Sequence, residues 1–340
     1  MKRKLQFIIL LVLITTLIGA GSGLAVAEAA TAEIVYLGGT PIGVVAESDG
    51  VVVQGFIGVM TEEGMANPAE GKGISVGDAI IEINGKAPVA QSDIADAVKD
   101  GKEVTLKLKR EDRIFYVKLK PAFDKISGAY KLGLQVKTDI AGVGTLTFVT
   151  EDGKSFGGLG HPINDAGASN SSVYQKGSIY PCRIIGTVKG EVGKPGELRG
   201  TFVKGKHSVG TLEHNNFAGI FGTAQKELSL GRSKISVAGR SEVRPGKAYI
   251  YTTTEGVEPK RYEIEIVKAV KQNDAAPQSM VLHVTDPELL ALTGGIVQGM
   301  SGSPIVQNDK IIGAVTHVFI NDPTRGYGIY IDWMLDQIGA

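Results

Sequence analysis

Short strand-like segments separated by glycines are the feature that most constrains the fold of this chain. Of its 340 residues 46 are glycine, and from Leu134 to about Ile338 apolar and β-branched runs alternate with glycine turns. Helical periodicity is scarce outside short pieces. This pattern predicts a mainly β body with many tight turns. The length allows two domains, each with its own core.

Residues 34–121 predict a small first domain. Residues 76–85 give a turn, a strand that alternates apolar and polar residues, and an Asn-Gly turn. Ser92 can then cap a short helix, and residues 104–108 alternate along another strand. This order resembles a PDZ domain, a β fold with short helices that adds an extended peptide to a sheet edge.

The peptide-binding loop of such a domain receives a carboxylate in a nest of backbone N–H groups. Ile42, Gly43 and Val44 fit its position near the start of the domain. They depart from the usual Gly-aliphatic-Gly-aromatic form. A second interpretation, that these residues simply begin a core strand, stays open.

A serine framed by glycines is the strongest candidate for a catalytic group. In the run Gly-Met-Ser-Gly-Ser-Pro, residues 299–304, the glycines around Ser301 let the backbone turn sharply and approach a substrate closely. Such a turn can aim the N–H groups of Gly299 and Ser301 at one point, as an oxyanion hole requires. A strand–turn–strand pattern follows in residues 305–315. An ordinary exposed turn is the alternative.

A serine nucleophile needs a base, and the chain has five histidines. His161 stands in another glycine-rich turn after a strand pattern. A carboxylate should hold the imidazole in the right tautomer. Asp286 ends an apolar run and is a candidate, although an Asp before Pro is also a common helix cap. Spacing does not exclude Asp165 or Asp139. His317 follows the serine on a predicted strand and is interpreted as substrate-facing or structural.

Several of these motifs together resemble the stage IV sporulation protein B family of serine peptidases. The resemblance is carried by residues 141–148, 159–161, 284–287, 294–305, 312–319 and 321–323. In that family the catalytic set is His, Asp and Ser in chain order, which implies His161 as base, Asp286 as orienting carboxylate and Ser301 as nucleophile. Ser303 is then a neighbour in the turn. The Asp lies only 15 positions before the Ser, unlike ordinary trypsin-like enzymes.

The resemblance implies a PDZ domain at 34–121 followed by a trypsin-like double β-barrel at 122–340. It also implies an exported endopeptidase that cuts a membrane-bound regulator, and itself, between the forespore and mother-cell membranes. The cut releases an intramembrane protease that activates a late sigma factor. Two rivals stay open: a PDZ-bearing scaffold with an inactive barrel, and a general quality-control serine protease.

Residues 1–30 have the pattern of an export signal. Residues 1–4 are basic, Leu5 to Ala20 is almost wholly apolar, and small residues follow. The apolar run is close to the lower limit for a bilayer span, about 17–25 residues. A cleaved signal peptide and an uncleaved membrane anchor are therefore both consistent with the sequence.

Charge and cysteine content exclude several function classes. The 36 basic and 36 acidic residues balance, which disfavours nucleic-acid binding through a basic surface. Cys182 is the only cysteine, so no internal disulfide forms, and its apolar neighbours predict a buried, inert thiol. His207 and His214 are seven positions apart without a third ligand, and we expect no metal or other cofactor.

Overall fold

The computed structural model describes residues 33–111, 113–164, 174–202, 204 and 207–338. The predicted export segment, residues 1–30, and the candidate carboxylate Asp165 lie outside these ranges. Within them, no helix has both the length and the apolar character needed to cross a bilayer. The described residues from Ile34 onward belong to one compact unit.

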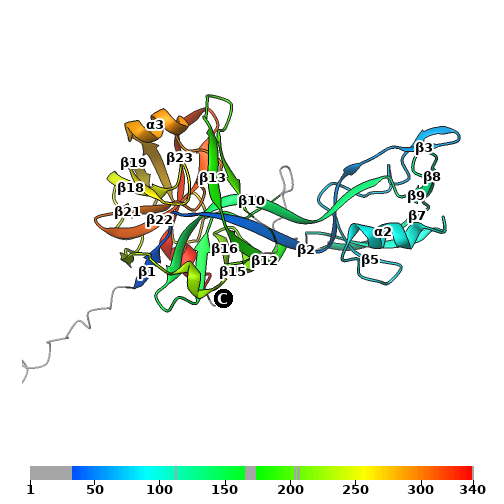
Figure 1. The fold of residues 1–340 in the computed structure, drawn as a ribbon, viewed down its shortest axis with the longest axis horizontal. Helices are drawn as coiled ribbons and strands as arrows, with labels where there is room; N and C mark the ends of the chain where they lie inside the picture. Colours follow the sequence, from blue (N-terminus) through cyan, green and yellow to red (C-terminus); the bar gives the residue numbers. More distant parts are fainter. Residues whose placement is uncertain (1–32, 112, 165–173, 203, 205–206, 339–340) are drawn as a thin grey trace, which may run out of the picture. The chain divides into compact units, whose positions relative to one another are not determined.

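The described chain is mainly β with few short helices, as predicted (Figure 1). The strands of the first third are β1 (Ile34–Leu37), β2 (Pro41–Phe56), β3 (Val59–Thr61), β4 (Gly64–Ala66), β5 (Ala79–Ile83), β6 (Val104–Arg110), β7 (Arg113–Leu119), β8 (Ala122–Asp124) and β9 (Ala129–Lys131). The next are β10 (Leu134–Thr150), β11 (Ser155–Gly158), β12 (Tyr174–Pro181), β13 (Arg183–Val188), β14 (Glu197–Thr201), β15 (Gly210–Asn216), β16 (Gly219–Ala224) and β17 (Lys234–Val237). The last are β18 (Gly246–Thr252), β19 (Lys260–Ala269), β20 (Met280–Val284), β21 (Pro304–Gln307), β22 (Lys310–Phe319) and β23 (Asp322–Tyr330). The helices are α2 (Gln91–Val98), the 3-10 helix η2 (Lys226–Leu228), α3 (Pro287–Thr293) and α4 (Ile331–Leu335).

Six strands near the C-terminus close into a β-barrel. The antiparallel pairings run β18–β19–β20–β23–β22–β21, and β21 returns to β18. Alternating residues of these strands point inward, as the period of two along a strand requires. Ile250, Ile264 and Leu282 are among those fully buried in its core.

A second circuit of six antiparallel pairings precedes the barrel in the chain. It runs β2–β10–β11–β16–β15–β12, and β12 returns to β2. Val44, Leu146 and Ile220 are fully buried in its core. We call the two sets the N-terminal circuit and the C-terminal barrel.

The residues predicted to form a peptide-binding loop are not in a loop, which corrects that expectation. Ile42, Gly43 and Val44 lie inside β2, where Gly43 is opposite Val143 of β10 on one side and Tyr180 of β12 on the other. Ile42 and Val44 are buried. With both strand edges paired, these residues offer no free row of N–H groups to a peptide.

A third core is formed by buried residues from the stretch of chain between Val51 and Val136. Residues of β5, β6, β7 and α2 belong to it. The first part of the predicted small domain lies outside this core: β1 pairs with β10 and β17, and the start of β2 belongs to the N-terminal circuit. The predicted cap at Ser92 is also wrong. The helix begins at Gln91. The N–H groups of Val89 and Ala90, the two residues before the helix, donate to the carboxylate of Asp93.

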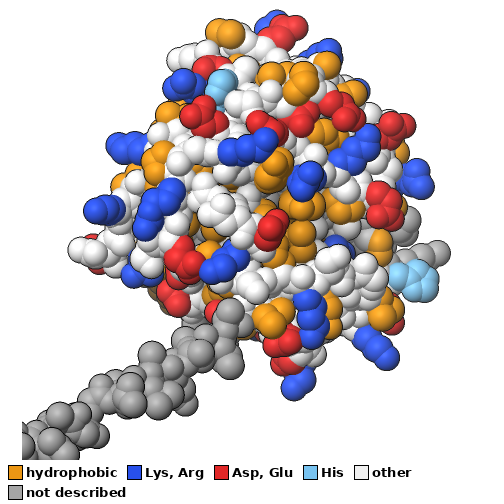
Figure 2. All heavy atoms as spheres, turned by 90° about the vertical axis from the view of Figure 1, so that its left-hand side faces the viewer, with side chains coloured by type: hydrophobic (Ala, Val, Ile, Leu, Met, Phe, Trp, Pro, Cys, Tyr) orange, Lys and Arg blue, Asp and Glu red, His pale blue; other side chains and the backbone are white. Residues whose placement is uncertain are grey.

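Figure 2 shows one face of the molecule, on which Lys, Arg, Asp and Glu side chains are interspersed. That face carries no continuous basic surface of the kind that follows a phosphate backbone.

Candidate functional site

The turn with the candidate nucleophile Ser301, residues 298–302, lies between α3 and β21 and is called the nucleophile turn below. Each of its carbonyl groups accepts a hydrogen bond. The donors, in order, are Leu198 N–H at 2.8 Å, Thr145 Oγ1 at 2.8 Å, Ser303 N–H at 2.9 Å, Thr145 N–H at 2.9 Å and Thr147 Oγ1 at 2.7 Å. Among the hydrogen bonds of the described residues, none has the N–H of Gly299 or Ser301 as donor.

Two free N–H groups in a turn whose carbonyls are all engaged are what an oxyanion hole requires. Gly299 and Gly302 adopt φ values of +93° and +92°, which favour glycine. A Cβ atom on Gly302 would collide with backbone atoms of Thr145 and Leu159. The glycine frame is therefore needed for this close approach to β10.

His161 follows β11 of the N-terminal circuit through a tight turn in which Leu159 and Gly160 have φ values of +64° and +67°. Its Nδ1 is 2.8 Å from the carbonyl oxygen of Pro162. Because a carbonyl only accepts, Nδ1 carries the proton in the neutral ring and Nε2 is left as an acceptor. Burial lowers the pKa of His161 to about 4, the Pro162 contact opposes that shift, and the neighbouring His317 adds to it.

His161 and Ser301 line the same pocket, of about 570 Å³, although they come from different strand circuits. His317 of β22 also lines it, with its ring centroid 4.8 Å from that of His161. The hydroxyl of Ser301 donates to the carbonyl of Thr316 at 3.0 Å. To reach His161 the hydroxyl therefore has to leave that acceptor, which rotation about the Cα–Cβ bond permits.

Asp286 is not among the residues that line this pocket. It is the N-cap of α3, where one carboxylate oxygen accepts the N–H groups of Glu288 and Leu289, at 2.9 and 3.1 Å. The other oxygen accepts the N–H of Glu263 at 3.1 Å. The helix-cap interpretation is thus confirmed, while the orienting role implied by the family resemblance stays a prediction. The rival Asp139 forms an ion pair with Lys204.

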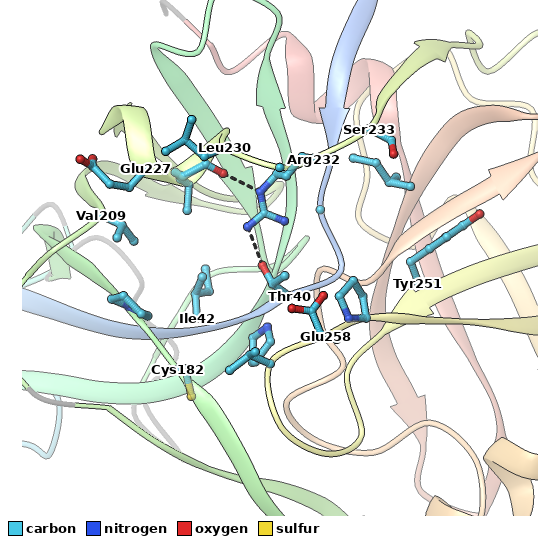
Figure 3. Close-up of a pocket in the computed structure, with 18 residues that line it drawn as sticks. Thr40, Ile42, Cys182, Val209, Glu227, Leu230, Arg232, Ser233, Tyr251 and Glu258 are labelled. Carbon is cyan, nitrogen blue, oxygen red and sulfur yellow. Dashed lines mark hydrogen bonds between the residues drawn. The ribbon is translucent and has the colours of Figure 1, made fainter.

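The thiol of Cys182 is buried, as predicted, and burial raises its pKa to about 11. It lines a different cavity of about 600 Å³ that holds neither His161 nor Ser301 (Figure 3). In that cavity Arg232 donates to the carbonyl of Leu228 at 2.5 Å and to Thr40 Oγ1 at 2.9 Å. The thiol is therefore an inert wall residue and not a nucleophile.

Sequence reasoning missed the contribution of Thr145 and Thr147. Both belong to residues 141–148, which the sequence analysis singled out only as part of a family resemblance. The sequence around these two threonines does not indicate that their buried hydroxyls donate hydrogen bonds to carbonyls of a turn more than 150 residues away. Among the described residues, no group of three or more His, Cys, Asp or Glu side chains is placed to hold a metal ion.

Comparison with known families adds a finding independent of this geometry. The family model described as SpoIVB peptidase S55 matches residues 128–335, more than half of the chain. His161, Asp286 and Ser301 all lie within the match. Strands β1 and β2, which precede residue 128, lie outside it.

Proposed function

The chain belongs to the SpoIVB peptidase S55 family of serine peptidases, and we propose that it is an endopeptidase with Ser301 as nucleophile and His161 as base. The observation that carries this is the shared pocket, which His161, Gly299 and Ser301 all line, while the N–H groups of Gly299 and Ser301 donate to no acceptor among the described residues. The two closed strand circuits support a trypsin-like double barrel with its site between them.

The reaction we propose is acyl transfer in two steps. Nε2 of His161 takes the proton of Ser301 as Oγ attacks a peptide carbonyl carbon, and the imidazolium then gives that proton to the leaving amine. Water, deprotonated by the same ring, hydrolyses the acyl-enzyme. The N–H groups of Gly299 and Ser301 stabilise the oxyanion in both steps.

Substrate binding beside Ser301 is supported by the open edge of β22. On one side the strand pairs with β23. On its other edge Val315 forms hydrogen bonds with Gly302 and Ser303, and beyond Val315 no described strand pairs with that edge. A substrate strand added along residues 316–319 would satisfy these backbone groups. Asp286 is proposed to support His161 from outside the pocket, in line with the family pattern.

Active-site labelling tests the nucleophile. The full chain, Ser301→Ala and Ser303→Ala are each treated with a fluorophosphonate, which reacts with an activated serine. We expect labelling of the parent and of Ser303→Ala but not of Ser301→Ala. An unlabelled parent, or a labelled Ser301→Ala variant, would contradict the proposal.

The finer role follows the family: an exported, sporulation-type peptidase that cuts a membrane-bound regulator, and itself near its N-terminus. The basic and apolar start of the chain supports export, and the third core, with its strand, helix and hairpin order, supports a PDZ-type domain that selects the target. Cleavage of a membrane-bound regulator but not of unfolded casein would support this role. Broad cleavage of casein would favour a general quality-control protease. A parent protein without peptidase activity would favour the PDZ-bearing scaffold with an inactive barrel.

A further inference from the structure

Two buried threonines of β10 reach from the N-terminal circuit to the nucleophile turn. Thr145 is 2% exposed and Thr147 is fully buried. Thr145 makes two contacts with the turn: its hydroxyl donates to the carbonyl of Gly299, and its backbone N–H donates to the carbonyl of Ser301. Both atoms therefore lie against the residues whose own N–H groups are free.

The orientation of those N–H groups depends on the peptide planes around them. A peptide group is planar, so fixing its carbonyl also fixes the direction of the N–H on the same plane. The carbonyls of Gln298 and Met300, which share planes with the N–H groups of Gly299 and Ser301, are held by Leu198 and Ser303. The plane between Gly299 and Met300 joins these two, and its carbonyl is held by the hydroxyl of Thr145.

Gly299 precedes the peptide plane whose carbonyl the Thr145 hydroxyl holds. At φ +93° it has no Cβ to restrict rotation. Two contacts hold the peptide plane that follows it: the Thr145 hydroxyl donates to its carbonyl, and its N–H, that of Met300, donates to the carbonyl of Val297 at 3.1 Å. Without the Thr145 hydroxyl, the carbonyl of Gly299 would lose its described donor, and the Met300 N–H contact with Val297 would be the one left to oppose its rotation toward the pocket. A carbonyl oxygen pointing there would repel the developing oxyanion instead of stabilising it.

We propose that Thr145 is a positioning residue for the oxyanion hole: from the opposite strand circuit, it holds the Gly299 carbonyl out of the pocket. This inference rests on the proposed peptidase function. It gives the turn a hydrogen-bonding partner on β10, and it assigns a role to the segment 141–148.

The test compares the full chain with Thr145→Val, which keeps the side-chain shape and removes the hydroxyl. Loss of one oxyanion donor lowers kcat by about 100- to 1,000-fold, and a donor that is misaimed for part of the time should lower it by roughly 10- to 100-fold. We expect KM to change less than about twofold, since ground-state binding does not use the oxyanion hole. Thr145→Ser keeps a hydroxyl and should restore most of the activity.

Thr252→Val is the matched control. Thr252 is a fully buried threonine whose hydroxyl has no partner among the described residues. The same change there removes no hydrogen bond, so kcat should stay within about twofold of the parent. Thr145→Ala replaces Thr145→Val if the latter does not fold, as judged by thermal denaturation.

A second readout separates positioning from general damage. A peptide boronate forms a tetrahedral adduct that needs the oxyanion hole, whereas a cleaved product peptide does not. Thr145→Val should bind the boronate at least tenfold more weakly and the product peptide unchanged. Parent-like kcat in Thr145→Val, or equal weakening of both ligands, would overturn the inference. An inactive, unlabelled parent would instead overturn the proposed function.

Discussion

Nδ1 of His161 lies 2.8 Å from the carbonyl oxygen of Pro162, its own chain neighbour. This contact does part of what a carboxylate does in a Ser-His-Asp triad, because it fixes the tautomer with Nε2 free to accept a proton. A neutral carbonyl, however, stabilises the imidazolium less than an anion would. With burial as the largest effect, the pKa of His161 falls to about 4.

This lowered pKa predicts an acid-tolerant enzyme. As the proposed base, His161 can act only when neutral, so the acid limb of kcat/KM should lie below pH 6.5 and near 4. The pH profile of peptide cleavage measures it directly. A limb at pH 6.5 to 7 would show that an anion, such as a carboxylate, reaches the ring in the free enzyme and raises its pKa.

The same shift predicts a loss of stability in acid. The folded state disfavours protonated His161, so this group's contribution is complete above its unfolded pKa of about 6.5 and is lost as the pH falls toward 4. Urea unfolding at pH 7 and pH 4.5 should show a larger drop for the parent than for His161→Gln, which cannot titrate. Equal drops in the two proteins would count against a lowered pKa of His161 in the folded state.

Ser303 differs from Ser301 in a way that unfolding experiments detect. Ser303 is fully buried, and its hydroxyl has no hydrogen-bond partner among the described residues. Removing an unsatisfied buried hydroxyl relieves a desolvation cost of about 1–3 kcal/mol, offset by the small cavity that is left. We expect the free energy of unfolding of Ser303→Ala, measured in urea, to equal or exceed that of the parent. A decrease above about 1 kcal/mol would reveal a partner for this hydroxyl.

Two substitutions of Asp286 distinguish a helix-capping role from a catalytic role. Asn caps helices about as well as Asp, whereas Ala loses the cap at a cost of about 0.5–2 kcal/mol. Asp286→Asn keeps the cap but places an NH2 group opposite the Glu263 N–H, so it should unfold at a urea concentration between those of the parent and of Asp286→Ala. If Asp286→Asn remains stable but loses activity by orders of magnitude, the carboxylate charge acts on His161 as the family pattern implies. Parent-like activity would leave Asp286 a helix cap only.

The pocket beside Ser301 predicts a preference for apolar substrate residues. Ile296, Val297, Val318 and Ile320 line it, and none of its described lining residues is Asp, Glu, Lys or Arg. An unpaired charge placed there would lose its hydration without compensation. Peptides that differ only at the residue before the cleaved bond should be cut at least about tenfold faster with Val or Ala than with Lys or Asp, measured as kcat/KM. Faster cleavage after Lys would contradict this prediction.

Much of the site follows from local sequence, because His161 and Ser301 stand in turns whose glycines permit unusual backbone angles. The partners of those turns do not follow from it. Whether Ile42 to Val44 lie in a loop or in a central strand depends on pairing with β10 and β12, about 100 and 140 residues away along the chain. The Thr145 contact with Gly299 spans 154 positions. The cap formed by Asp286 was visible locally, since it needs only the next few N–H groups.

Gly302 offers a test of how closely the two strand circuits approach each other. Its φ is +92°, and a Cβ atom there would meet the backbone of Thr145 and Leu159, which cannot move aside without disrupting β10. Gly193 is the matched control: its φ is +80°, but a Cβ there has nothing within 4 Å. Gly193→Ala carries only backbone strain, about 1–2 kcal/mol, and should keep its activity.

Gly302→Ala combines that strain with the collision, so we expect it to lower the free energy of unfolding by roughly 2–5 kcal/mol. Because the collision pushes the nucleophile turn away from Thr145, fluorophosphonate labelling of Ser301 should also slow by at least about tenfold under conditions where the variant remains folded. Urea unfolding and labelling rates of the two alanine variants measure both effects. Equal stability and equal labelling in the two variants would mean that the turn can move away from β10 without loss, and that the contact between the circuits does not hold the nucleophile in place.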